Sequence, residues 1–215
     1  MRVPALPLVA LLSVVAACAG GPDALPEGAG KGLLRADDPP AQGPTWSRPS
    51  WAVGNRFSLV RGEQLRGTFE VVAAGDDGYV IDAGGGRELR RDLDLGNLGE
   101  WTEGAPSRVL SPADVRYHWP LWVGKRWECE FVDRVRGGEA LPMSASYEVE
   151  ALDRVVVPAG AFDALRIRRT LRLGLPDSAG TFLTRTQMTW YAPEPGLEVR
   201  QLLGDTMVEL VDFER

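Results

Sequence analysis

Hydrophobic and polar residues alternate along much of the sequence, and the alternation is clearest over residues 165–173. Positions 165, 167, 171 and 173 are Leu or Ile, whereas the residues between them are Arg or Thr. Arg169 is the one charged residue on the otherwise apolar face. A period of two is typical of a β-strand that buries one face and exposes the other. The stretch therefore predicts a strand that covers a hydrophobic core.

Similar short runs continue from residue 56 to the C-terminus, and Gly- or Pro-containing turns separate them. No window of ten residues has a convincing helical period, and Ser111–Asp114 is compatible with one helical turn at most. The sequence therefore predicts an all-β fold, an antiparallel meander with little or no helix outside a signal peptide. The expected strands are 56–60, 68–73, 79–83, 88–95, 126–133, 146–152, 154–157, 165–173, 182–191, 197–203 and 206–213.

A repeat divides this β region into two halves. VGNRF at 53–57 matches VGKRW at 123–127, and GTFEVVA at 67–73 matches ASYEVEA at 145–151. Each half thus begins with a turn and a strand, and each continues into an aromatic-Glu-Val strand. We expect two related lobes that form curved sheets or half-barrels, because an isolated hairpin pair is not stable in water.

The N-terminus has the features of an export signal. Arg2 precedes an apolar run over residues 3–15, which is too short to span a bilayer as a mature helix but suits the core of a signal peptide. The run ends in Val-Ala-Ala-Cys at 15–18, which resembles the lipobox of bacterial lipoproteins. The resemblance implies that Cys18 is joined to diacylglycerol, that cleavage precedes it, and that acyl chains such as palmitate anchor the mature protein in a membrane.

The residue after Cys18 is Ala19, and not the Asp that resembles an inner-membrane retention signal in enterobacteria. The resemblance therefore implies an outer-membrane protein that faces the periplasm, if the cell has two membranes. The segment that follows is rich in Gly and Pro and poor in large apolar residues, which predicts a flexible tether. The expected organisation is a signal peptide at 1–17, a tether at 18–47 and a β domain at 48–215, with halves at about 51–110 and 119–215.

The net charge of the chain is −6, and Lys and Arg are not clustered as they are on nucleic-acid-binding or polybasic membrane surfaces. Nucleic acid is therefore not expected as a partner. The arginines of 166–172 are a local exception. We expect them to pair across strands with glutamates at 128, 130, 148 and 150.

Few residues suit catalysis or metal binding. His118 is the single histidine, and no GxSxG motif accompanies it. With Cys18 acylated, Cys129 is the one remaining thiol, and its period-two spacing from two aromatic residues predicts a buried side chain rather than a nucleophile. An acidic loop at 92–103 lacks part of the ligand set of an EF-hand. We therefore expect no enzymatic activity, no metal and no cofactor.

Tryptophan is frequent, and four of the seven lie near the starts of the two halves, at Trp51, Trp119, Trp122 and Trp127. These rings have two interpretations. They either fill the core between the lobes or line a groove that accepts an acyl chain, a glycan or a peptide.

Three segments carry a further resemblance: WPLWVGKRW at 119–127, VPAGAFDALRI at 157–167 and TWYAPEPGL at 189–197. Their order and spacing resemble a group of exported bacterial β proteins of unknown function, many of them lipoproteins. The resemblance implies a curved antiparallel sheet, similar to periplasmic lipoprotein-carrier folds. It implies no catalytic residues.

The sequence predicts a lipid-anchored module of the cell envelope. Its partner is expected to be an envelope protein, a lipid or a glycan, bound through the concave face or an edge of the sheet. The alternative is a periplasmic carrier or chaperone for a lipid or lipoprotein, which requires an apolar cavity. A hydrolase is the third hypothesis.

Overall fold

The computed structural model describes residues 30–62, 64–174 and 182–215. These residues form 13 β-strands and no helix, which confirms the all-β fold. Ser111–Asp114, compatible with a helical turn in the sequence, instead completes a strand. The strands are β1 (Gly32–Ala36), β2 (Arg56–Arg61), β3 (Gln64–Gly75), β4 (Gly78–Asp82), β5 (Arg87–Arg91), β6 (Asn97–Thr102), β7 (Ala105–Asp114), β8 (Arg126–Val135), β9 (Ala140–Val157), β10 (Gly160–Gly174), β11 (Phe182–Ala192), β12 (Leu197–Leu203) and β13 (Thr206–Glu214).

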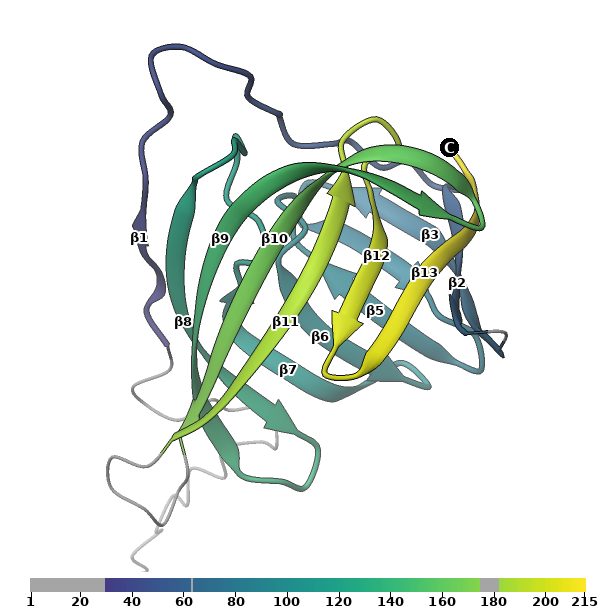
Figure 1. Cartoon of the computed structure of the whole chain (residues 1–215). Coiled ribbons are helices and arrows are strands. Elements are labelled where there is room, and N and C mark those ends of the chain that lie inside the picture. Colours follow the sequence, from purple (N-terminus) through teal and green to yellow (C-terminus); the bar gives the residue numbers. More distant parts are fainter. Residues whose placement is uncertain (1–29, 63, 175–181) are drawn as a thin grey trace, which may run out of the picture.

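Strands β2 to β13 form a closed barrel (Figure 1). Each strand pairs antiparallel with the next strand of the chain, and β13 returns to pair with β2. The predicted meander is therefore confirmed. Its first half, β2–β7, meets its second half, β8–β13, at the β7–β8 and β13–β2 pairs. The two halves continue one curved sheet that closes on itself.

The two copies of the sequence repeat form equivalent turns. The Gly54 N–H donates to the Val71 carbonyl at 2.8 Å, and the Gly124 N–H donates to the Val149 carbonyl at 2.7 Å. Both glycines have positive φ, at 92° and 98°, where a residue without a Cβ is favoured. The repeat thus specifies how each half-barrel begins, with a turn that precedes the first strand of the half and hydrogen-bonds to the second.

The repeat also places an aromatic pair across each first hairpin. Phe57 stacks on Phe69 with ring centroids 5.2 Å apart, and Trp127 stacks on Tyr147 at 4.9 Å. Cross-strand aromatic pairs of this kind stabilise a sheet and help to fix its register. On the opposite face of both hairpins, an ion pair joins the same two strands: Arg56 with Glu70, and Arg126 with Glu148, each at 2.6 Å.

Part of the segment predicted as a flexible tether is ordered in the structure. Residues Gly32–Ala36 form β1, which pairs with residues 127–130 of β8. Strand β7 pairs with β8 only over residues 132–135, so the first half of β8 has a free edge that β1 occupies. Backbone groups at such an edge need partners, and β1 supplies them despite the Gly- and Pro-rich sequence around it.

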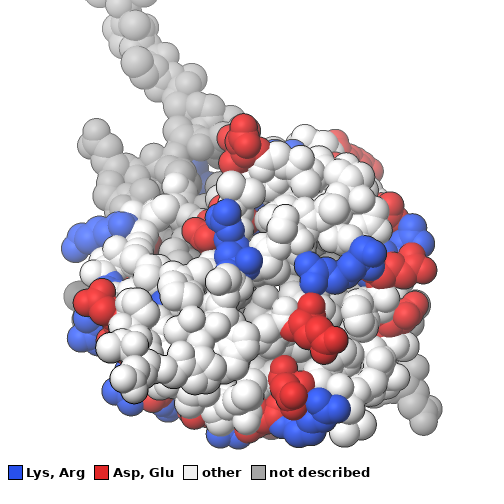
Figure 2. Space-filling model, turned by 90° about the horizontal axis from the view of Figure 1, so that it is seen from above, with Lys and Arg blue, Asp and Glu red and all other residues white. Residues whose placement is uncertain are grey.

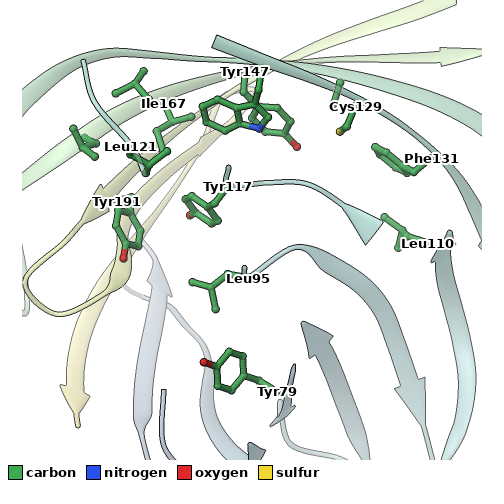
Figure 3. Close-up of a cluster of buried hydrophobic side chains, with 14 of the residues drawn as sticks. Tyr79, Leu95, Leu110, Tyr117, Leu121, Cys129, Phe131, Tyr147, Ile167 and Tyr191 are labelled. Atoms are coloured by element: carbon green, nitrogen blue, oxygen red, sulfur yellow. The ribbon is translucent and has the colours of Figure 1, made fainter. Parts of the chain in front are cut away.

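One end of the barrel is filled by side chains. This closed end contains the start of β2, the 115–125 connection and the β11–β12 turn. Aromatic and aliphatic residues from both halves point toward one another there (Figure 3). Buried members of this cluster include Tyr79, Leu95, Tyr117, Leu121 and Tyr191. Figure 2 shows the closed end from outside, where Lys, Arg, Asp and Glu are scattered without a large patch of one sign.

The β9–β10 hairpin extends past its neighbours and bends over β11 to β13 (Figure 1). The turn predicted at Pro158-Ala159-Gly160 lies at its tip, and the Ala159 N–H donates to the Leu210 carbonyl of β13 at 3.1 Å. A second hydrophobic cluster fills the space beneath the hairpin, with Phe162 and Val199 among its buried members. On the outer face, Arg168 pairs with Glu148 and Arg166 pairs with Glu150, as predicted. The other two predicted partners pair elsewhere, Glu128 with Arg35 and Glu130 with Lys31.

Candidate functional site

The barrel interior holds a cavity of about 630 Å³. Its walls come from strands β2 to β12, and on most of these strands the lining residues recur with a period of two, as expected for one face of a sheet. On β5, for example, Arg87, Leu89 and Arg91 line the cavity, whereas Glu88 and Arg90 between them do not. The cavity is therefore built from regular strand positions.

One part of the wall is apolar. Leucines from β10, β11 and β12 form this part of the wall, at the strand ends that are farther from the closed end. Inward-facing side chains of β2 and β3 add to it. Leu183, on this wall, is 47% exposed, whereas lining residues at the closed end, such as Tyr117 and Leu197, are buried. The cavity thus communicates with solvent at the end of the barrel opposite the closed end, which we call the open end. The apolar lining includes Leu59, Phe69, Leu171, Leu173, Leu183 and Leu203.

The rest of the lining is strongly charged. Six arginines and four carboxylates contribute to it. Charged side chains are rarely turned toward a barrel interior unless they are paired, because removing a charge from water is costly. The lining arginines are Arg87, Arg91, Arg108, Arg116, Arg169 and Arg185, and the lining acids are Glu100, Asp114, Asp133 and Glu198.

Asp114 is the centre of one buried network. Asp114 is only 2% exposed. The carboxylate accepts hydrogen bonds from the Tyr147 hydroxyl at 2.5 Å and from Nη2 of Arg169 at 2.6 Å. Arg169 also donates to Tyr147 and to Oε1 of Gln187, both at 2.9 Å. Burial, followed by the charge of Asp114, raises the pKa of Tyr147 well above its ordinary value, so this hydroxyl stays a hydrogen-bond donor.

Glu198 is the centre of a second network. It accepts a hydrogen bond from the Tyr117 hydroxyl at 2.6 Å and pairs with Arg116 at 3.0 Å. Gln201 donates to its other carboxylate oxygen. Burial disfavours the charged form of Glu198, but the Arg116 guanidinium and the hydrogen bonds outweigh that effect and hold the pKa of this carboxyl below its ordinary value. The carboxylate is therefore charged and fully engaged.

The remaining two acids are also paired. Arg108 contacts both carboxylate oxygens of Asp133, at 2.8 and 2.5 Å. Arg87 lies 3.5 Å from Glu100. Each of the four lining acids therefore already has one arginine, and two arginines remain: Arg91 and the exposed Arg185. The charged lining has a surplus of positive charge.

Arg91 is the more unusual of the two. Its Nη1 is buried and has no hydrogen-bond partner among residues 30–62, 64–174 and 182–215. No carboxylate in these ranges forms an ion pair with Arg91. Burial, and then the like charge of Arg116, lower the pKa of the Arg91 guanidinium. In the ranges given above, the arrangement leaves a buried guanidinium nitrogen without a hydrogen-bond partner beside an internal cavity, although the negative charges of Glu198 and Asp114 lie near enough to favour the charged form of Arg91.

The structure separates the four candidate tryptophans. Trp51 lines the cavity, where its Nε1 donates to the Gly196 carbonyl at 3.0 Å. Trp127 is fully buried, Trp122 is 7% exposed with the Lys125 ammonium over its ring, and Trp119 stacks on Tyr117. Of the four, Trp51 alone lines the cavity, and the others pack at the closed end. The predicted lipidation site, Cys18, lies outside the described residues.

Sequence reasoning did not identify the charged lining. One signal was present, because Arg169 interrupts an otherwise apolar strand face. In the structure that position faces inward and pairs with Asp114. Strand periodicity alone gave no means of finding its partner, since Asp114 lies on a different strand and 55 positions earlier in the chain.

The other candidate chemical groups are placed as follows. Cys129 is buried, and burial, followed by the negative charge of Asp114, raises the pKa of its thiol to about 12. His118 is not among the cavity-lining residues. Within the described part of the chain, no group of three or more His, Cys, Asp and Glu side chains is arranged to hold a metal ion. In the same residues, no helix has the length and apolar character needed to cross a membrane.

Comparisons with known proteins bear on the fold. No protein-family model matches the sequence, and a comparison with curated proteins gives no match. Among solved structures, the hypothetical lipoprotein YmcC from Escherichia coli K12 is similar, with a TM-score of 0.51 and 11% identity over 78% of this chain and 90% of YmcC.

Two further structures are a presumed exported protein with a YmcC-like fold from Bacteroides fragilis and a presumed lipoprotein from Parabacteroides distasonis. Their TM-scores are 0.46 and 0.45, with 13% and 12% identity. Both comparisons cover 80% of this chain and all of the other protein. The likeness to YmcC shows that this chain and that lipoprotein share a fold.

Proposed function

We propose that this protein is a lipid-anchored, non-catalytic binding protein of the bacterial cell envelope that holds an amphiphilic ligand inside its barrel. The observation that carries the proposal is the cavity of about 630 Å³, with leucines on one part of its wall and arginine-rich polar groups on another. Ligand sites in proteins commonly enclose about 300–1,000 Å³ and combine apolar walls with a few polar groups that orient the ligand. Of the hypotheses from the sequence, a lipid carrier requires such a cavity.

Binding accounts for the polar lining better than catalysis does. The lining carboxylates pair with arginines, as described above, and the single histidine lies elsewhere. A hydrolase needs a nucleophile and a base within hydrogen-bond reach of each other, and the raised pKa of Cys129 disfavours the thiolate that would act as a nucleophile. A role in orienting and holding a ligand requires no such pair.

The anchor rests on the lipobox at 15–18 and agrees with the description of YmcC as a lipoprotein. If acyl chains are attached at Cys18, cells fed a labelled palmitate analogue will incorporate it into the protein, and Cys18→Ser will abolish the label. The matched control is Cys129→Ser, which removes the other thiol and is expected to keep full labelling and membrane retention. Incorporation that survives Cys18→Ser would contradict the proposed anchor.

The ligand can be sought with a soluble form, in which residues 19–215 follow an ordinary cleavable signal peptide. This form keeps β1 and every other described residue. Native mass spectrometry after purification without detergent is expected to show added mass that disappears on denaturation. Extraction and tandem mass spectrometry would then identify the amphiphile. A protein that carries no added mass, and that does not bind added fatty acids or lysolipids by calorimetry, would overturn the proposal.

A further inference from the structure

Nη1 of Arg91, a buried nitrogen with no hydrogen-bond partner among the described residues, defines the chemistry of the ligand more closely. We infer that the cavity takes an amphiphile with an anionic head, a carboxylate or a phosphate monoester, and that Arg91 binds this head. The inference rests on the proposed function, because it assigns the polar end of the ligand proposed above. It goes further in excluding cationic and uncharged heads as the preferred ligands.

The ion pairs in the cavity lining support an anionic ligand. The four lining carboxylates already pair with Arg87, Arg108, Arg116 and Arg169, so none is left over for Arg91. An isolated charge in a desolvated site is costly unless an opposite charge and hydrogen bonds compensate it. An anionic head that accepts a hydrogen bond from Nη1 of Arg91 would supply both. It would also offset the effects that lower the pKa of this guanidinium.

The strand register shows where the head would sit. Arg91 pairs with Asn97 on β6, and Asn97 pairs in turn with Asp114 on β7, so the three inward-facing side chains form a row across the wall. The Asn97 side-chain oxygen accepts the N–H of Gly99 at 3.2 Å, which leaves its amide NH₂ group as a donor. Arg91 and Asn97 thus offer neighbouring donors beside the closed end of the barrel.

The same register places a hydrophobic tail. Leu173 pairs with Leu183 where β10 and β11 reach the open end, and Leu203 lies at the corresponding end of β12. A ligand whose head contacts Arg91 can therefore extend its chain along these leucines toward solvent. The positively charged Arg185 lies on the same wall, where it would attract an anionic ligand as it enters the cavity.

The test compares four ligands that share a dodecyl chain: dodecanoate, dodecyl phosphate, dodecanol and dodecyltrimethylammonium. Each is titrated by calorimetry, below its micelle concentration, into the soluble form described above. The anionic ligands are expected to bind at least tenfold more tightly than the other two, since a hydrogen bond to a charged group contributes this much or more. The ratio of the affinities for dodecanoate and dodecyl phosphate distinguishes a carboxylate head, as in a fatty acid, from a phosphate monoester head.

Arg91→Met supplies the second arm. It is expected to weaken dodecanoate and dodecyl phosphate binding by about 10–100-fold and to leave dodecanol binding unchanged. The matched control is Arg90→Met, because Arg90 is adjacent and does not line the cavity. Thermal unfolding of the ligand-free variants separates binding from folding. Arg91→Met is expected to keep or raise the unfolding midpoint, because it removes a cation that, in the part of the chain that the structure describes, forms no ion pair and has a buried nitrogen without a hydrogen-bond partner.

The outcomes distinguish the two proposals. If none of the four ligands binds, the proposed function fails. If dodecanol binds as tightly as dodecanoate, or if Arg91→Met binds dodecanoate like the original protein, the cavity still holds an amphiphile but the assignment of an anionic head to Arg91 is overturned.

Discussion

Asp114→Asn is expected to reduce the free energy of unfolding by about 3–5 kcal/mol, the range found when one partner of a buried ion pair is removed. The carboxylate is 2% exposed and accepts hydrogen bonds from Tyr147 and Arg169. Asparagine has a similar shape but no charge, so the substitution leaves the Arg169 guanidinium largely uncompensated. Urea unfolding, followed by tryptophan fluorescence and circular dichroism, would measure the loss.

An exposed ion pair provides the control for this prediction. Asp163 and Arg154 lie 3.1 Å apart, with their side chains 68% and 62% exposed, and Asp163→Asn is expected to cost less than about 1 kcal/mol. The double variant Asp114→Asn with Arg169→Met should be more stable than Asp114→Asn alone, since it removes the isolated charge. A loss at Asp114 no larger than that at Asp163 would show that the buried network contributes little to stability.

Trp127→Ala is the second large effect, with an expected loss of about 3–5 kcal/mol. Trp127 is fully buried, stacks on Tyr147, and donates from Nε1 to the Val115 carbonyl at 2.8 Å. Truncation therefore opens a cavity and also leaves the partly buried Val115 carbonyl without its partner. Chemical unfolding at constant pH would measure the change.

The repeat offers an internal comparison for Trp127. Phe57 occupies the same place in the first half-barrel, stacks on Phe69, and is only partly buried. Phe57→Ala is expected to cost about 1–2 kcal/mol, because less apolar surface is lost from the interior. Equal losses of unfolding free energy at the two positions would mean that the two aromatic residues contribute equally to stability. That result would contradict the expectation from their different burial.

The architecture could be predicted from the sequence to the extent that its signals are local. Alternation with a period of two and Gly-containing turns specify strands and hairpins, and the VGxR repeat identified two related halves. Closure of the barrel is not local. It depends on the pairing of β13 with β2, and no pattern within either strand shows which partner it will take.

Two other features could not be predicted from the sequence, for different reasons. The composition around β1 predicts a tether, and the strand forms because β7 leaves half of β8 without a partner. The charged lining of the cavity depends on complementary residues that meet only after the barrel has formed. A lone charge such as Arg169 in an apolar strand face indicates that a partner exists, but the identity of Asp114 follows from the tertiary structure.

Closure through β13 and β2 also bears on the order in which the protein folds. Ten of the eleven other barrel pairs join strands that are direct neighbours in a hairpin, and even the β7–β8 pair joins consecutive strands. These contacts can form early, because they close short loops. The pairing of Phe57 with Phe213 must wait until β13 has been made. Until then the sheet has unpaired edges at β2 and at its last strand, so an incompletely folded chain is most vulnerable to aggregation and proteolysis before β13 is in place.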